Sequence, residues 1–368
     1  MCDHCLKYNR NPIQCIVPPH MLEVLAIRGN KGVSEMAKAL LAQNEKTRAE
    51  RADIRVGEIL VQEPSNMSEF VARSLLEGAT TATVKRKVYD GENKAGLPGK
   101  LVRKEGDPAS GDAAVDAAYD GAGDVFDLYY STYQRDSLDG NGLELIQTVH
   151  HRKNYNNAFW EGAQMVYGDG DQTIFKTFTE LSVIGHEMSH GVVQFSGGLQ
   201  YQGQSGALNE SYADVMGAMT VQRKAGQDAC DADWLVGKGI LGDNIKGVAL
   251  RSMKAPGTAY SDALLGQDPQ PFHMDFYVNT TSDNGGVHIN SGIPNRAFYV
   301  TAYELDGFAW ERAGVIWYET MISPFLGPTA RFSRFARLTL LTARQLFGTD
   351  SEEERAVRKG WDAVEISV

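Results

Sequence analysis

The 368-residue chain lacks the features that mark secreted, membrane-spanning and nucleic-acid-binding proteins. Charged residues and a proline (Asp3, Lys7, Arg10 and Pro12) interrupt its start, so it has no apolar run of about seven to fifteen residues there and no conventional secretory signal. No stretch reaches the roughly eighteen apolar residues of a membrane span. The net charge of −11 disfavours nucleic acid and anionic membranes as partners. We expect a monomer that is cytoplasmic as synthesised, with unconventional secretion left open.

Cysteine is scarce and oddly placed. Cys2, Cys5 and Cys15 lie in the first fifteen residues, and Cys230 stands alone in the second half of the chain. In a chain without a secretory signal, reduced thiols are the default, so a disulfide framework is not expected. The chain also lacks internal repeats and low-complexity tracts. What it has is the 42% hydrophobic and 23% charged content of an ordinary globular protein, long enough for two or three domains.

The most informative segment is His186-Glu187-Met188-Ser189-His190. Two histidines four apart lie on one face of a helix, where they can hold one side of a tetrahedral Zn²⁺ with Glu187 beside the open position. Glu210, on a following helix, can supply the third ligand and leave the fourth position to water. The alternative is a solvated helix face that carries histidines by accident. Apolar neighbours argue against it, because a buried helix needs partners for its polar groups; they are Leu181, Val183, Ile184, Val192 and Val193.

Hydrophobic patterning predicts an α+β protein with a β-rich lobe at residues 81–195, which includes the zinc helix, and a helical lobe at 196–368. In the first lobe we expect strands at 85–103 (a pair), 143–151 and 158–167 and a helix at 112–134. In the second we expect helices at 297–303, 310–320, 331–347 and 355–364. Residues 1–80 are expected to hold an extended stretch at Pro18-Pro19, helices at 33–51 and 67–76, and a strand at 56–60.

Around the zinc motif the chain resembles the thermolysin family of zinc metalloendopeptidases. Further blocks follow in family order: Asn156 to Trp160, Tyr167 to Asp171, Leu250 to Met253, and Asp283 to Gly292. The resemblance runs from about Val88 to the carboxyl terminus. Upstream, the Pro18-Pro19-His20-Met21-Leu22 segment resembles the short propeptide of the protealysin-like branch.

The resemblance implies a two-lobe fold with the zinc helix at the junction, and a neutral endopeptidase made as a latent precursor. His186, His190 and Glu210 would bind the single catalytic zinc, and Glu187 would be the general base. His288 and Tyr201 would donate hydrogen bonds to the oxyanion, with Tyr212 the alternative to Tyr201, and Asp283 would hold His288 protonated. Asp214 and Asn209 would hold the zinc-binding imidazoles.

The same resemblance implies how peptide substrates are held. Asn157, the backbone of Ala158, and Arg251 would grip the substrate backbone. An aliphatic pocket would accept the side chain after the cleaved bond and favour cleavage on the amino-terminal side of bulky hydrophobic residues; its walls are Val183, Val236, Ile240 and Leu250. Two other functions are weighed: a peptide binder that does not cleave, and a hydrolase of non-peptide amides. Retention of both a base and oxyanion donors favours the peptidase.

The chain departs from the family at the paired calcium site. Ser182 stands where an acid is expected, Val221 or Gln222 replaces another, and Lys238 a third, while Asp233 is kept. Calcium takes about six to eight oxygen ligands, several of them charged, so calcium binding is possible but the paired site is degraded. We expect Lys238 to replace the cation and to pair with nearby carboxylates.

Residues 1–80 are expected to occupy the cleft as a propeptide, cut somewhere between about residues 50 and 84. Three interpretations of the amino-terminal cysteines stay open. One thiolate could take the fourth zinc position; Cys2, His4, Cys5 and Cys15 could form a separate metal site; or the thiols could be reduced and unordered.

Overall fold

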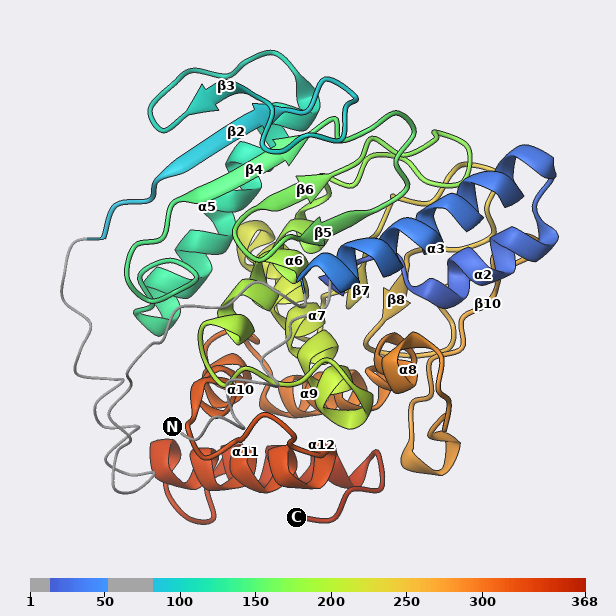
Figure 1. The fold of residues 1–368 in the computed structure, drawn as a ribbon. Helices are drawn as coiled ribbons and strands as arrows, with labels where there is room; N and C mark the ends of the chain where they lie inside the picture. The colour runs from blue at the N-terminus through green and yellow to red at the C-terminus, as the bar shows by residue number, and fades with distance from the viewer. Residues whose placement is uncertain (1–13, 52–81) are drawn as a thin grey trace.

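The computed structural model describes residues 14–51 and 82–368 (Figure 1). The predicted strand at 56–60, the helix at 67–76, the cleavage point, Cys2, His4 and Cys5 lie outside the described residues. The α+β architecture is confirmed: a sheet with one long helix against it forms one lobe, and a group of helices forms the other.

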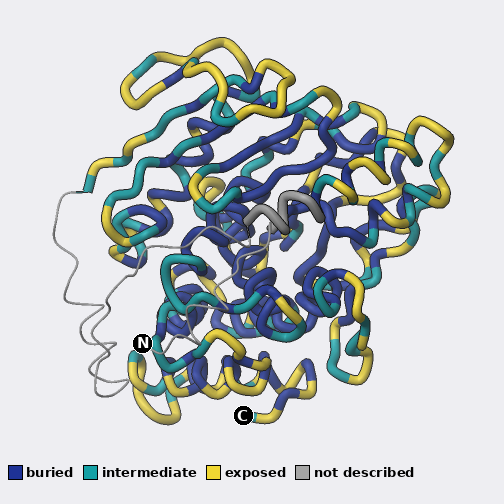
Figure 2. Tube along the Cα trace, in the orientation of Figure 1, coloured by how far each residue is buried: buried dark blue, intermediate teal, exposed yellow. Residues whose placement is uncertain are grey.

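The sheet has six strands in the order β1-β5-β6-β4-β2-β3. Their bounds are β1 Gln14–Cys15, β2 Arg86–Asp90, β3 Lys100–Lys104, β4 Leu145–Val149, β5 Ala158–Trp160 and β6 Met165–Tyr167. β4 pairs parallel with both β2 and β6, and the other pairs are antiparallel. Its central strands are buried, whereas the ends of the β2–β3 hairpin are exposed (Figure 2).

One predicted strand was wrong in extent. Residues 158–167 form a hairpin, β5 and β6, because the chain turns where the Glu161 N–H donates to the Gln164 carbonyl. Gly162, within the turn, has a φ of 101°, a conformation that favours glycine. The turn leaves β5 beside β1, at the side of the sheet where the site lies.

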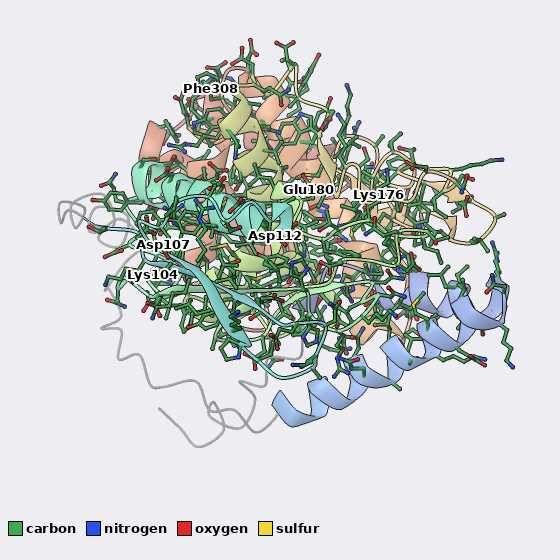
Figure 3. The ribbon with its side chains drawn as sticks, turned by 90° about the horizontal axis from the view of Figure 1, so that it is seen from above. Lys104, Asp107, Asp112, Lys176, Glu180 and Phe308 are labelled. Atoms are coloured by element: carbon green, nitrogen blue, oxygen red, sulfur yellow. The ribbon has the colours of Figure 1, made fainter. Side chains whose placement is uncertain are left out.

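Helix α5, Ala113–Tyr133, confirms the helix predicted at 112–134, and it packs on the sheet. It begins at Asp112, whose carboxylate accepts the N–H groups of Ala114 and Val115 and so caps the helix. Figure 3 labels Asp112 at this helix start and Glu180 at the start of the next helix, α6. The helix is apolar on its inner side, which covers the sheet and contacts α6.

Helices α6, Leu181–Gln194, and α7, Gly203–Ala225, cross beneath the sheet. They approach closely because glycines face one another where they meet. A Cβ on Gly217 would lie 2.4 Å from the Ser182 carbonyl oxygen, and one on Gly185 would lie 2.9 Å from the Gly217 Cα. Both helices are almost wholly buried over their central turns, so their polar residues must find partners inside the protein.

The carboxyl-terminal lobe is helical, as predicted. It holds α8 Asp283–Asn290, α9 Gly292–Leu305, α10 Ala313–Ile322, α11 Phe332–Phe347 and α12 Glu352–Asp362, with a short 3₁₀ turn at Met274–Phe276. Two small hairpins precede them: β7 Leu235–Val236 with β8 Arg251–Ser252, and β9 Ser261–Asp262 with β10 Gly266–Gln267. Within the described residues, none of the helices has the length and apolarity to cross a membrane.

Before the sheet, α2, Pro19–Arg28, and α3, Lys31–Arg51, form a helical hairpin along one side of the molecule (Figures 1 and 3). Helix α3 matches its prediction. The extended stretch expected at Pro18-Pro19 was misplaced: Pro18 is extended, but Pro19 begins α2, because proline fits the first helical position. A short strand, β1, lies just upstream.

Candidate metal centre and active site

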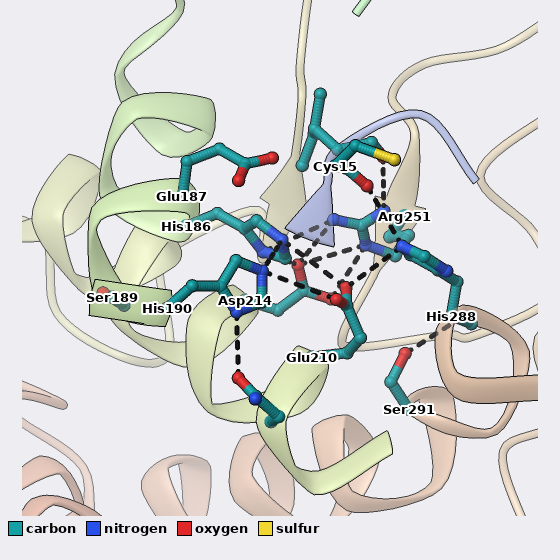
Figure 4. A network of polar contacts seen from close by, with 12 residues as sticks. Cys15, His186, Glu187, Ser189, His190, Glu210, Asp214, Arg251, His288 and Ser291 are labelled. Carbon is teal, nitrogen blue, oxygen red and sulfur yellow. Dashed lines mark hydrogen bonds and ion pairs between the residues drawn. The ribbon is translucent and has the colours of Figure 1, made fainter. Parts of the chain in front are cut away.

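Three side chains converge between α6 and α7. The ligand atoms of His186, His190 and Glu210 lie within 4.8 Å of one another, and all three residues are buried. The two Nε2 atoms are 3.1 Å apart, and Glu210 oxygens lie 3.5 Å from the Nε2 of His186 and 3.4 Å from that of His190 (Figure 4). Helical spacing places the histidines on one face of α6, and the close crossing of the two helices brings Glu210 to them.

The donor set fits a zinc ion. His186 Nδ1 is 2.8 Å from Asp214 Oδ1 and His190 Nδ1 is 2.9 Å from Asn209 Oδ1. Both partners are acceptors, so the Nδ1 atoms carry the hydrogens and both Nε2 lone pairs face the centre. Burial lowers the pKa of His190 to about 3, which keeps it neutral. Glu210 Oε2 is buried and accepts no hydrogen bond from any described residue.

Asp214 joins this centre to Arg251. Its carboxylate accepts hydrogen bonds from Arg251 Nε at 2.8 Å and Nη2 at 2.8 Å, and from Asn295 Nδ2 at 2.8 Å. Burial opposes its ionisation, but Arg251 and His186 outweigh burial and lower the pKa of Asp214. Asn295 lies in no motif, and sequence reasoning missed it.

Glu187 projects from α6 towards β5 and is fully buried. Its Oε2 accepts the backbone N–H of Trp160 at 3.0 Å. Sequence reasoning missed this contact because a backbone donor leaves no signal in the sequence. The hydrogen bond ties the carboxylate to β5. In Figure 4 the carboxylate lies on the same side of the ligand cluster as Cys15, opposite Glu210.

His288, Tyr201 and Asp283 form a second polar group, which meets the cluster at Glu210. His288 Nδ1 is 2.6 Å from Asp283 Oδ1, and Tyr201 Oη lies 3.1 Å from His288 Nε2 and hydrogen bonds to Glu210. Burial works against a charged imidazole, yet Asp283 and Glu210 raise the pKa of His288 above its ordinary value. The alternative tyrosine, Tyr212, is instead 3.5 Å from the hydroxyl of Tyr129, away from these groups.

Asp283 is the first residue of α8. Asn284, Gly285 and Gly286 have φ values of 49°, 82° and 75°, so a left-handed turn precedes the regular part of the helix. The Asp283 Oδ2 accepts the backbone N–H of His288 at 2.9 Å. This local bond positions the carboxylate against the imidazole, as the family resemblance implied.

Three of the four aliphatic residues, Val236, Ile240 and Leu250, lie together around β7 and β8. Val236 in β7 pairs with Arg251 in β8, and the Leu250 N–H donates to the Val236 carbonyl at 3.0 Å. Ile240 and Leu250 both lie against Gly237. Val183 comes from α6, one turn before Glu187. All four side chains are at most 1% exposed and belong to the hydrophobic core.

Of the three amino-terminal cysteines, the structure describes only Cys15. Within the described residues, the side chains placed to hold a metal are His186, His190 and Glu210, and Cys15 is not among them. The Cys15 thiol lies 3.7 Å from the Val17 carbonyl and 3.9 Å from Asn44 Nδ2, and it is the carbonyl of Cys15 that meets His288. The other members of the suggested separate metal site lie outside the described residues.

At the expected calcium position, Lys238 forms an ion pair with Asp233 at 2.6 Å. Both side chains are largely exposed, at 64% and 47%. Ser182 points into the protein and accepts the Gly237 N–H at 2.8 Å. The Lys238 ammonium group therefore lies directly against the Asp233 carboxylate.

Two family models cover nearly all of the described catalytic region. The thermolysin metallopeptidase catalytic domain matches residues 69–194, and the thermolysin metallopeptidase alpha-helical domain matches residues 197–366. The chain belongs to the thermolysin family of metallopeptidases. It is a zinc metalloprotease, as the resemblance of its motifs implied.

Individual relatives are similar to this chain over most of its length. An extracellular metalloprotease of Pectobacterium carotovorum subsp. carotovorum is 51% identical over 77% of this chain and 81% of its own length. Protease PrtS of Photorhabdus sp. (strain Az29) is 43% identical over 99% of this chain and 95% of its own. The solved precursor of protealysin from Serratia proteamaculans matches with a TM-score of 0.84 and 43% identity, covering 96% of this chain and all of that one. Likeness to a precursor over nearly the whole chain fits a latent enzyme with an amino-terminal propeptide.

Proposed function

We propose that this metalloprotease cleaves peptides on the amino-terminal side of bulky hydrophobic residues, with Glu187 as general base. The observation that carries the proposal is the buried carboxylate of Glu187, which lies by the cluster of His186, His190 and Glu210 on the side opposite Glu210 (Figure 4). When bound there, zinc polarises the scissile carbonyl and lowers the pKa of a water molecule towards neutrality.

Glu187 performs the proton transfers in this scheme. Its carboxylate takes a proton from the attacking water and delivers it to the nitrogen of the departing amine. The Trp160 N–H holds Oε2 in place, which supports a fixed direction for the transfer. The bond is made by backbone, so side-chain substitutions at Trp160 do not remove it.

His288 and Tyr201 are placed to stabilise the negative charge that develops on the carbonyl oxygen. The proton on His288 is favoured by Asp283, whose carboxylate is 2.6 Å from Nδ1. Arg251, Asn157 and the Ala158 backbone hold the substrate main chain. The aliphatic side chains of Val183, Val236, Ile240 and Leu250 support a preference for bulky apolar residues after the cleaved bond, worth about 1–3 kcal/mol per methylene.

Replacement of Glu187 by Gln tests the assignment. We expect hydrolysis of casein and of a furylacryloyl dipeptide to fall by a factor of about 100 to 10,000, because the general base is lost. Zinc content, measured by atomic absorption, should stay at that of the unaltered protein. Removal of zinc with a chelator should abolish hydrolysis, and added zinc should restore it.

The control is Lys238→Gln, a change on the exposed surface away from the zinc ligands, which should leave hydrolysis intact. Full hydrolysis by Glu187→Gln would contradict the role of the base. Bound zinc with no hydrolysis by the mature protein would favour the peptide binder.

We also propose that Lys238 takes the place of a calcium ion at Asp233. The ion pair between them supports this, and titration of the protein with calcium should give no binding near Asp233 and no rise in melting temperature. Stoichiometric calcium bound at Asp233 would disprove it. The domain boundaries, the monomeric state and cytoplasmic synthesis stay predictions from the sequence.

A further inference from the structure

The backbone of residues 14–17 crosses the site as a peptide would. β1 pairs antiparallel with β5, with Gln14 opposite Trp160 and Cys15 opposite Phe159. β5 begins at Ala158, directly after Asn157, and both residues are assigned to substrate binding, so the amino-terminal strand uses the edge at which a substrate would be held. Cys15, Ile16 and Val17 are all fully buried.

The polar backbone groups around the Cys15–Ile16 bond lie within hydrogen-bond distance of residues assigned to substrate binding or oxyanion stabilisation. His288 Nε2 is 3.0 Å from the Cys15 carbonyl oxygen. The Ile16 N–H donates to the Ala158 carbonyl at 3.2 Å, and Arg251 Nη1 donates to the Ile16 carbonyl at 3.1 Å.

The next residue continues the pattern. The Val17 N–H donates to Asn157 Oδ1 at 2.9 Å. The groups that would hold the residues after a cleaved bond therefore hold Ile16 and Val17. The group that would stabilise the oxyanion holds the carbonyl of Cys15.

This pairing of residues 15–17 with the site presents one peptide bond, Cys15–Ile16, to the oxyanion donor His288. The Ile16 carbonyl is occupied by Arg251, away from His288, so the Ile16–Val17 bond is not presented to the oxyanion donor. Only the Cys15 carbonyl among these residues meets His288. Ile16 is also a bulky aliphatic residue, which matches the preference proposed for the position after the cleaved bond.

We propose that the precursor hydrolyses its own Cys15–Ile16 bond. The inference rests on the proposed function. Water adds its oxygen to the Cys15 carbonyl carbon, the bond from that carbon to the Ile16 nitrogen breaks, and a proton passes through Glu187 to the nitrogen. The products are a Cys15 carboxylate and an Ile16 ammonium group, and no oxidant or reductant is needed.

This cut does not by itself release the propeptide. Helices α2 and α3 follow Ile16 and remain part of the chain, with Met21, Leu22 and Leu25 buried against the protein. Arg251 and Asn157 still hold Ile16 and Val17. Release of the propeptide therefore needs a further cut, expected between about residues 50 and 84.

The test uses the purified full-length chain loaded with zinc. Intact-mass measurement and amino-terminal sequencing should find a peptide of residues 1–15 and a new terminus at Ile16. The rate constant should not change over a hundredfold range of protein concentration, because the bond lies in the chain's own site. Glu187→Gln should keep residues 1–15 attached.

Matched substitutions distinguish an effect on cleavage of the Cys15–Ile16 bond from an effect on folding of the propeptide. Ile16→Leu should keep the cut, and Ile16→Asp should slow it by a factor of ten or more, because a charged side chain has no place in an apolar pocket. The control is Ile27→Asp, which lies in the same propeptide but is 83% exposed. It should leave the rate unchanged.

A second readout does not depend on hydrolysis. In zinc-free Glu187→Gln protein, amide hydrogen exchange should show protection of Ile16 and Val17, and Asn157→Ala should reduce protection at Val17. The proposal would be overturned if the mature enzyme hydrolysed casein but no terminus at Ile16 had formed, or if the cut persisted in Glu187→Gln. It would also be overturned if the rate constant of the cut rose in proportion to protein concentration, or if the amides of Ile16 and Val17 were unprotected. A chain that hydrolyses neither casein nor itself overturns the proposed function as well.

Discussion

Asp214 shows how single residues connect the metal ligands to the substrate-binding groups. The family resemblance implied that it holds a zinc-binding histidine, and the structure places it against both His186 and Arg251. The partner Asn295 was not predictable, because it comes from α9, distant in sequence, and belongs to no recognisable pattern. Backbone groups such as the Trp160 N–H are equally invisible in the sequence.

We predict that Asp214→Asn weakens zinc binding by a factor of about 10 to 100, because a neutral amide polarises the His186 ring less and leaves the charge of Arg251 uncompensated. Competition with a chromogenic chelator measures the affinity. Asp233→Asn, an exposed change at the Lys238 ion pair, serves as the control and should bind zinc normally. Equal affinities in the two variants would count against this role of Asp214.

At the scale of elements, the meeting of α6 and α7 decides whether a third ligand reaches the histidines. The sequence indicated both helices and their ligands, since periodicity along one helix is a local property. It did not indicate the two glycines as the crossing point, because nothing local distinguishes them from other helical glycines. The single strand predicted at 158–167 was wrong for a related reason: the reversal at Gly162 interrupts an otherwise apolar stretch.

We predict that Gly217→Ala lowers the free energy of unfolding by about 1–3 kcal/mol, because the added Cβ would lie 2.4 Å from the Ser182 carbonyl oxygen. Alanine favours a helix over glycine by about 1 kcal/mol, but steric overlap with backbone is the larger effect. Urea denaturation measures the change. Gly96→Ala is the control, since a Cβ there meets nothing within 4 Å, and it should be near neutral. A stabilised Gly217→Ala protein would show that the helices need no close approach.

For the whole molecule, the docking of the amino-terminal segment should depend on pH through His20. Its Nε2 lies 3.1 Å from the Tyr260 hydroxyl, and its buried Nδ1 has no hydrogen-bond partner among the described residues. Burial lowers the pKa of His20 to about 4; Asp283 opposes the shift, while His288 and Arg251 add to it. The undocked histidine, with its ordinary pKa near 6.5, takes up a proton first, so docking is stable above that pH and weakens as the pH falls towards 4.

We predict that the docked segment of Glu187→Gln protein loosens up to about tenfold per pH unit between 6.5 and 4, and that His20→Phe shows a smaller loss. Hydrogen exchange of the α2 amides measures the docking equilibrium at each pH. Comparing the two proteins removes contributions from other titrating groups such as Glu23 and His288. Identical pH profiles would exclude His20 as the sensor.

The sequence by itself determined the family, the α+β class, the zinc-binding helix and most of the helices, because spacing along one helix places side chains without knowledge of the rest of the chain. Tertiary structure decided how Glu210 reaches the histidines, which tyrosine lies beside them, and which backbone bond of the amino-terminal segment meets His288. Those contacts join residues up to 273 positions apart, and periodic patterns carry no information about which distant segments come together.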